Sequence, residues 1–386
     1  MKKTVYFSII LLPLVFSGCK SSPKIPEAPV QHNISLVFAG DIMAHKPNYN
    51  MKKYSKIWAG ISDIITDCDY AFANIEAPVC DSIPFSTYPN FNMNSSYPQA
   101  AIDAGFNVFS VINNHSNDQG LEGIKGTISW ANTIENHTKN SHRPVYVSGL
   151  NEIPHSPISY KIIKNENWTI LYSAVTEILN RPDFRSYMNY VVSSKSGWEE
   201  FSGYLKELRE NNPCDLFIVS IHTDEPEYIA PVAQKRKEYY YNLLNNAGVD
   251  VIYTNHPHII RERELIGDAQ SKVLRKAIIY GNGNVISGQR WEPDFQNPEN
   301  PRDDTGDGFI WKLTFTKTNL DPEPVITKSE PFYITTYINT AWEFVIQKLD
   351  ENFISYLNET GRTGWAKYIQ ARKEISEKTK ETIIWR

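Results

Sequence analysis

Short apolar runs alternate with longer amphipathic segments from Ile34 to about Ser287. The apolar runs are typical of strands buried on both faces, and they lie at 34–39, 71–73, 108–112, 170–174, 216–221, 249–253 and 277–280. Between them, apolar residues at helical spacing predict helices at about 98–105, 120–138, 198–211 and 231–247. Alternation of this kind predicts an α/β fold.

The pattern changes after Gly288. Residues 289–308 are dense in Pro, Asn and Asp, which predicts a long loop. Beyond it, Trp311–Lys317 and Pro324–Thr336 predict strands, and helical spacing predicts helices at 340–357 and from 363 to about 382. The charged residues here are those of solvated helix faces. We therefore expect a main domain at 33–320 and a C-terminal strand and helical extension at 321–386.

The first residues resemble an export signal. Lys2 and Lys3 precede an uncharged run at 5–16 and the small residues before Cys19. The run is shorter than the roughly 20 apolar residues that a spanning helix needs. Residues 1–18 therefore predict a signal peptide, and Cys19 resembles the lipidated cysteine of a bacterial lipobox; a plain signal peptide with an incidental Cys19 is the alternative. Residues 19–32 would then form a tether, and the protein would be exported and lipid-anchored in the cell envelope.

Charge and cysteine content narrow the classes of partner. The formal charge is −5, and loss of the two N-terminal lysines makes it about −7. No Lys/Arg block offers the basic face that a nucleic-acid partner needs. Cys68, Cys80 and Cys214 follow Cys19. A Cys68–Cys80 disulfide and three reduced thiols both fit this number.

Polar residues follow six of the apolar runs within a few positions. They are Asp41, Asn74, Asn113-Asn114-His115, His222, Asn255-His256 and Gly283-Asn284. Ligands of open α/β sheets bind beyond the carboxyl ends of the strands, so these positions predict one shared site. Singly, each has an ordinary explanation as a helix cap, a turn residue or a structural histidine.

Together, these residues supply the ligand types that a pair of divalent cations requires. Such a pair takes carboxylates, one of them bridging, together with imidazole and amide groups. The His-x-His spacing at His256 and His258 lets two rings reach neighbouring metals. Pro257 between them predicts an extended backbone at His256.

The ordered motifs resemble those of the calcineurin-like metallophosphoesterases, and more narrowly the CapA-type poly-γ-glutamate capsule synthesis family. The resemblance covers about Ser35 to Ser287. The blocks that carry it are Gly40-Asp41-Ile42-Met43, Ala73-Asn74-Ile75-Glu76, Asn113-Asn114-His115 with Asp118, His256-Pro257-His258 and Tyr280 through Asn284. The resemblance implies a four-layer α/β/β/α sandwich, the C-terminal helices being an appendage to it.

The resemblance also implies roles for individual residues. Asp41 and His258 would hold one metal, Glu76 would bridge, and Asn114, His222 and His256 would hold the second. His115 would act as general acid or phosphate contact, oriented by Asp118. Met43 stands where the superfamily usually has a histidine ligand, and Asn74 or His45 would fill that gap. The substrate-binding residues implied are His45, Asn113 and Asn284, whereas Arg290 is more simply a surface residue.

The implied activity is hydrolysis of a phosphoester by two metal ions, which mixed carboxylate and imidazole ligation leaves open between manganese, iron and zinc. The family also implies a role in capsule or other envelope polymer biosynthesis, with an anionic polymer as substrate and the capsule synthesis machinery as partner. A noncatalytic or amide-directed partner in polymer assembly is the alternative, and a metal-free binding protein is a third. His222-Thr223-Asp224 and Thr254-Asn255 depart from the family pattern, which predicts an altered substrate shape.

Overall fold

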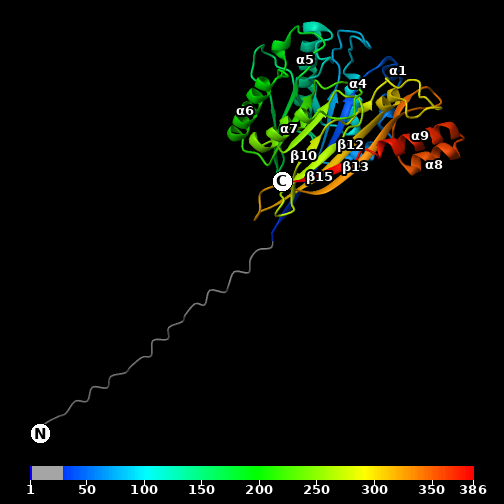
Figure 1. Ribbon diagram of the computed structural model, residues 1–386. Coiled ribbons are helices and arrows are strands. Elements are labelled where there is room, and N and C mark those ends of the chain that lie inside the picture. Colours follow the sequence, from blue (N-terminus) through cyan, green and yellow to red (C-terminus); the bar gives the residue numbers. More distant parts are fainter. Residues whose placement is uncertain (2–28) are drawn as a thin grey trace.

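Two β-sheets packed face to face organise the computed structural model of the chain, in which Met1 and residues 29–386 are described (Figure 1). The first sheet has the order β14 (Phe344–Lys348), β13 (Val325–Ile338), β12 (Asp307–Thr318), β1 (Gln31–Ile42), β2 (Tyr70–Ile75), β3 (Val108–Ser110) and β4 (Tyr146–Ser148), and β11 (Asn284–Ile286) also pairs with β1. The second has the order β15 (Glu381–Trp385), β9 (Arg263–Gly267), β10 (Leu274–Ile279), β8 (Val251–Asn255), β7 (Leu216–His222), β6 (Thr169–Thr176) and β5 (Lys161–Lys164).

Helices cover the outer face of each sheet. Short helices α1 (Lys46–Tyr49), α2 (Ser55–Trp58) and α3 (Ser62–Thr66) join α4 (Ser96–Ala104), α5 (Gly120–Thr138), α8 (Glu351–Glu359) and α9 (Thr363–Ser376) on the side of the first sheet. Helices α6 (Lys195–Asn211) and α7 (Gln234–Asn246) pack on the second. Two short 3-10 turns lie at Arg185–Tyr187 and Pro301–Gly306. The predicted four-layer α/β/β/α sandwich is confirmed.

Aromatic side chains fill the space between the two sheets. Phe38 of β1 stacks on Phe72 of β2 with ring centroids 5.0 Å apart, and its ring lies 5.5 Å from that of Tyr253 in β8. All three are fully buried. This contact joins the sheets because strands buried on both faces offer apolar side chains to both neighbouring layers. It fixes the strand ends of one sheet relative to those of the other.

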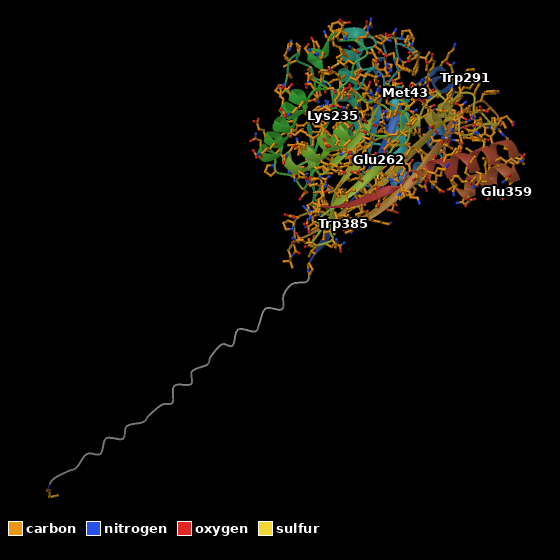
Figure 2. All side chains as sticks on the ribbon, viewed as in Figure 1. Met43, Lys235, Glu262, Trp291, Glu359 and Trp385 are labelled. Atoms are coloured by element: carbon orange, nitrogen blue, oxygen red, sulfur yellow. The ribbon has the colours of Figure 1, made fainter. Side chains whose placement is uncertain are left out.

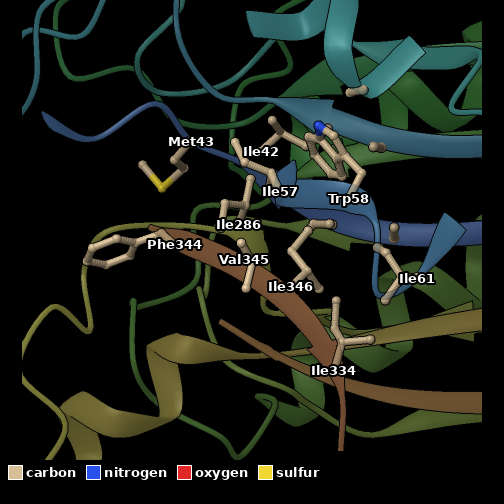
Figure 3. Close-up of a cluster of buried hydrophobic side chains, with 14 of the residues drawn as sticks. Ile42, Met43, Ile57, Trp58, Ile61, Ile286, Ile334, Phe344, Val345 and Ile346 are labelled. Atoms are coloured by element: carbon tan, nitrogen blue, oxygen red, sulfur yellow. The ribbon is translucent and has the colours of Figure 1, made fainter. Parts of the chain in front are cut away.

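The predicted helix at 340–357 is wrong in its first half. Residues 344–348 form β14, which pairs antiparallel with β13, and the helix begins only at Glu351 with Asp350 as its N-cap. Figure 3 shows Val345 and Ile346 facing Ile57 and Trp58 of α2, and Phe344 near Met43. Pairing with β13 buries these side chains on a sheet edge and overrides the helical spacing.

The predicted helix from 363 to about 382 is also too long. Helix α9 ends at Ser376, and β15 then pairs parallel with β9 in the second sheet. The strand material expected at 311–317 and 324–336 is present as β12 and β13.

The predicted signal peptide, Cys19 and most of the predicted tether fall on residues 2–28, which lie outside the described residues. Within residues 29–386, no helix combines the length and apolar character that a membrane span requires. Cys68, Cys80 and Cys214 are all free thiols, in keeping with the reduced alternative.

Candidate metal centre

Strand ends from both sheets converge on one buried cluster. β1 delivers Asp41, and β2 delivers Glu76 one residue past its end. β7 ends on His222, and the turn after β8 carries His256 and His258. Asp41 stands directly opposite Asn284 of β11 in the parallel pairing. The predicted shared site at the carboxyl ends of the strands is therefore present in the fold.

A close approach at Gly40 makes this convergence possible. A Cβ atom at Gly40 would lie 1.8 Å from the carbonyl oxygen of Gly283. The missing side chain lets the Asp41 amide donate a hydrogen bond to that oxygen at 3.1 Å. Any larger residue would push β1 away from the turn before β11.

Glu76 is shared by two overlapping groups of possible metal ligands. In one group, Asp41, Glu76 and His258 each offer an atom within 4.8 Å of the others; in the second, Glu76, His222 and His256 do the same. Nε2 of His258 lies 3.6 Å from Oε1 of Glu76, and Nδ1 lies 3.4 Å from Oδ2 of Asp41. All of these side chains are buried.

Burial shifts the pKa values of these groups. Desolvation, followed by the negative charge of Asp41, raises the pKa of Glu76 well above its ordinary value. Desolvation and the neighbouring histidines lower the pKa of His222 well below its usual range and that of His256 to about 3. Desolvation alone would lower the pKa of His258, but the hydrogen bond to Asp41, the charges of Asp41 and Glu227 and the hydrogen bond to Asn284 together raise it.

The donor atoms fit a metal ion. Oε1 of Glu76, Nδ1 of His222 and Nδ1 of His256 are buried and lack hydrogen-bond partners among the described residues. Nε2 of His222 lies 2.9 Å from Oδ1 of Asn114, the amide oxygen predicted to share its metal. Buried polar atoms without partners are rare in folded proteins, and a bound cation accounts for three of them converging here.

His115 lies beside this cluster in a fixed orientation. Its Nδ1 is 2.7 Å from Oδ2 of Asp118, and its backbone N–H donates to Oδ1 of Asn113 at 3.1 Å. The same Asp118 oxygen accepts from the backbone of Phe91 at 2.7 Å, and the Phe91 ring packs edge-on against His115 at 4.7 Å. Carboxylates that accept from one imidazole nitrogen fix the tautomer and leave the other nitrogen free.

The remaining predicted site residues lie around the cluster. The Asn74 amide donates to Oδ1 of Asp41 at 2.8 Å, so its nitrogen rather than its oxygen faces the carboxylates. The Asn113 amide donates to the carbonyl of Ile75 at 2.8 Å. Oδ1 of Asn284 accepts from Nδ1 of His258 at 3.0 Å. His45 accepts from the Gly288 N–H, and burial with the nearby histidines lowers the pKa of His45 to about 3.

The predicted extended backbone at His256 is wrong. Its φ angle is 101°, and that of His258 is 58°, so both residues on either side of Pro257 have left-handed backbones. Residues other than glycine rarely adopt such φ angles. Residues with these angles cluster at ligand-binding sites, where the surroundings impose the strained backbone. Here the backbone N–H of His256 donates to Oδ2 of Asp41 at 3.4 Å.

Two further residues of the cluster were not among the predicted metal ligands or catalytic residues. Glu227 forms a third possible ligand group with His256 and His258, and its Oε1 lies 3.8 Å from Nε2 of His256. The Asn180 amide lies 3.2 Å from Nδ1 of His115, and its oxygen accepts from Asn114 at 3.3 Å. Both residues lie in loops between a strand and the next helix. Loops have no periodic hydrophobic pattern from which the placement of a side chain could be predicted.

Arg290 is buried, which corrects its assignment to the surface. It donates to Asp307 at 2.8 Å, and Arg372 of α9 donates to the other oxygen of the same carboxylate at 2.7 Å. The adjacent carbonyl of Thr305 accepts from the Asn284 amide at 2.8 Å. Hydrogen bonds therefore connect the C-terminal helix, through the loop at 287–307, to His258.

An α/β/β/α sandwich with carboxylates and imidazoles gathered at its strand ends defines a candidate metalloprotein. Residues 35–289 match the family described as bacterial capsule synthesis protein PGA_cap, and the chain belongs to this family. This confirms the capsule synthesis resemblance drawn from the motifs.

Two relatives carry names from the same process. The capsule biosynthesis protein CapA of Bacillus anthracis is 24% identical over 321 residues, which cover 75% of this chain and 70% of the relative. The PGA biosynthesis protein CapA of Bacillus subtilis (strain 168) is 23% identical over 304 residues, covering 75% and 74%. The crystal structure of a phosphatase from Mycoplasma pneumoniae is 13% identical, with a TM-score of 0.46 over 85% of this chain and 99% of that one.

Proposed function

We propose that this chain is a metal-dependent phosphoesterase that acts in the biosynthesis of capsule or another envelope polymer and holds two divalent cations. The observation that carries the proposal is the shared position of Glu76. It belongs to one ligand group with Asp41 and His258 and to another with His222 and His256. A carboxylate common to two ligand sets is what a pair of neighbouring cations requires as a bridge.

The residues around the cluster would divide the remaining work. When bound, the cations would neutralise charge on the phosphoryl oxygens and activate a water nucleophile. Oδ2 of Asp118 lies 2.7 Å from Nδ1 of His115 and would accept its N–H. Nε2 is then the atom from which a proton would pass to the leaving group. Asn113 fixes the His115 backbone, and Asn114 would bind the second cation through its side-chain oxygen.

Metal content and turnover of matched variants test this proposal. We expect the protein purified without chelator to hold divalent metal and to hydrolyse members of a panel of phosphomonoesters and diesters. His256→Ala should lose metal and turnover, whereas His137→Ala, which removes an exposed imidazole of α5, should keep both. Unchanged metal content and turnover in His256→Ala would show that the assignment is wrong.

A role as an assembly partner is the second candidate, because both relatives are named for biosynthesis rather than for hydrolysis. Metal bound with no turnover of phosphoesters or of poly-γ-glutamate would favour it. Absence of metal from the purified protein would instead favour a metal-free binding protein that keeps only the fold.

We also propose that Cys19 anchors the protein to the cell envelope by a lipid. The support is the sequence pattern of Lys2, Lys3, the apolar run and the small residues before Cys19. Cys19→Ala should move the protein from the membrane fraction to the soluble fraction. Retention in the membrane fraction would remove the lipid anchor from the proposal.

A further inference from the structure

A hollow opens beside the candidate metal centre at Tyr228. The Tyr228 ring lies 6.0 Å from that of His258, and Gln289 donates to the Tyr228 hydroxyl at 3.3 Å. A hollow of about 390 Å³ is lined by Tyr228, Gln289, Pro301, Arg302 and Thr305. Tyr228 and Arg302 are both exposed, so this hollow is open to solvent directly next to the buried ligands.

A second hollow is related to the first by a contact between their wall residues. The Arg302 guanidinium lies 5.6 Å from the centre of the Trp291 ring. Trp291 lines a hollow of about 320 Å³, whose other walls are Glu292, Pro293, Phe295, Ile338, Asn339, Trp342, Arg362 and Trp365. Asn339 also lines a third hollow of about 690 Å³, which extends over α8 to Tyr356. The Arg302–Trp291 contact and the shared wall residue Asn339 thus relate three hollows between the metal centre and the C-terminal helices, and we name these three hollows the track.

The walls of the track indicate the chemistry of its occupant. Trp342 is 76% exposed and Trp291 is 47% exposed, and both indoles face the middle hollow. Large aromatic groups left in water beside a pocket mark binding sites, and indoles favour flat ligand faces that also carry polar groups. Arg302 and Arg362 add guanidinium groups, which recognise carboxylates and phosphates. Arg302 lies over Trp291 and Arg362 over Trp365, and a plain acyl chain would offer no acidic group to either guanidinium.

We propose that the track binds an anionic polysaccharide, with sugar rings against Trp291 and Trp342 and acidic groups at Arg302 and Arg362. Pyranose rings offer an apolar C–H face for each indole and hydroxyls for the polar wall. A polyglutamate chain offers carboxylates and methylenes but no ring face, so it leaves the indoles uncovered. The proposal rests on the proposed function only for the reaction at the end of the track, because binding to the track needs no metal.

Binding measurements on chelator-treated protein test the track separately from turnover. The probes are hyaluronan oligosaccharides of graded length, neutral dextran and poly-γ-glutamate, measured by calorimetry. We expect affinity for hyaluronan to rise with length across the track and to exceed that for dextran and poly-γ-glutamate. Inactivity of the protein toward phosphoesters would leave these results unaffected.

Matched tryptophan variants locate the binding. Trp342→Ala and Trp291→Ala should each weaken hyaluronan binding about tenfold. Trp385→Ala is the control, because Trp385 is also 40% exposed but lies far from Trp291 in the molecule (Figure 2). Thermal unfolding of each variant verifies that it is folded. Equal binding by Trp342→Ala and wild type, preference for poly-γ-glutamate or dextran, or no binding of hyaluronan would each overturn the proposal.

Discussion

Glu76→Gln should stabilise the metal-free protein while abolishing its response to metal. Glu76 is fully buried, one of its oxygens has no hydrogen-bond partner among the described residues, and Asp41 lies in the same cluster. An unpaired buried polar group costs about 1–3 kcal/mol, and more when it is charged. Gln keeps the shape and removes the charge. We therefore expect the free energy of unfolding at pH 7 in chelator to rise by about 1–3 kcal/mol.

The pH dependence of stability gives the sign of this effect independently. Burial raises the pKa of Glu76. At pH values between the ordinary and the raised pKa, the folded state therefore keeps a proton on this carboxyl that the unfolded state has released. Wild-type stability should fall as pH rises through that window, by up to about 1.4 kcal/mol per pH unit. Glu76→Gln removes this contribution, so its stability should depend less on pH between the ordinary and the raised pKa.

Calorimetric unfolding with and without manganese measures both effects. Metal at 100 times its dissociation constant should stabilise the wild type by about 2.7 kcal/mol, and Glu76→Gln by far less. Glu177→Gln is the matched control, because Glu177 is equally buried but accepts from Arg236 at 2.6 Å and from Trp198 at 2.7 Å. That change should destabilise the protein by about 1–3 kcal/mol, since it removes the charge of one of the two carboxylates that pair with the buried Arg236, Asp224 being the other. A loss of stability in Glu76→Gln, or a metal response equal to that of wild type, would refute the reasoning.

Three further predictions follow from other sites. Arg372→Leu should lower the free energy of unfolding in urea by about 3–5 kcal/mol, because it leaves Asp307 with one of its two cationic partners. It should also weaken metal binding, because hydrogen bonds of Thr305, Asn284 and His258 connect this ion pair to the metal centre. Arg372→Lys should restore part of both effects, and unchanged metal affinity in Arg372→Leu would contradict the connection. Burial raises the pKa of Cys214 to about 11, so its alkylation, followed by mass spectrometry, should be slow at pH 8 and accelerate about tenfold per pH unit; fast labelling at pH 8 would contradict this. Metal binding at pH 7 should release protons from Glu76 and His258, whose pKa values are raised, but not from His222 or His256, whose pKa values are lowered. Calorimetry in two buffers of different ionisation enthalpy should detect the released protons. Binding heats that do not depend on the buffer would contradict this prediction.

The sequence predicts elements well where local pattern and packing agree. The expected helix at 120–138 coincides with α5, and the apolar runs that end in polar residues became the central strands of both sheets. Prediction failed where a distant partner decides the structure. Val345 and Ile346 have helical spacing to Leu349 and Phe353, but β13 takes them into the first sheet.

The candidate site shows the same division. Residues at strand ends were placed correctly because the fold class alone brings carboxyl ends together. Arg290 was misplaced because the carboxylate that buries it stands 17 residues away and is shared with Arg372 of α9. Glu227 and Asn180 were not predicted to lie within the cluster, because the loops that carry them have no periodic pattern. The φ angle of 101° at His256 also depends on its neighbours rather than on Pro257.

The direction of β1 determines which end of the domain carries the candidate metal centre. Its 12 residues run from Gln31, beside the C-terminus in Figure 1, to the neighbourhood of Asp41. At about 3.3 Å per residue, the strand spans roughly 36–40 Å. With the proposed lipid anchor upstream of Gln31, the candidate metal centre at the other end of β1 would face away from the attachment point.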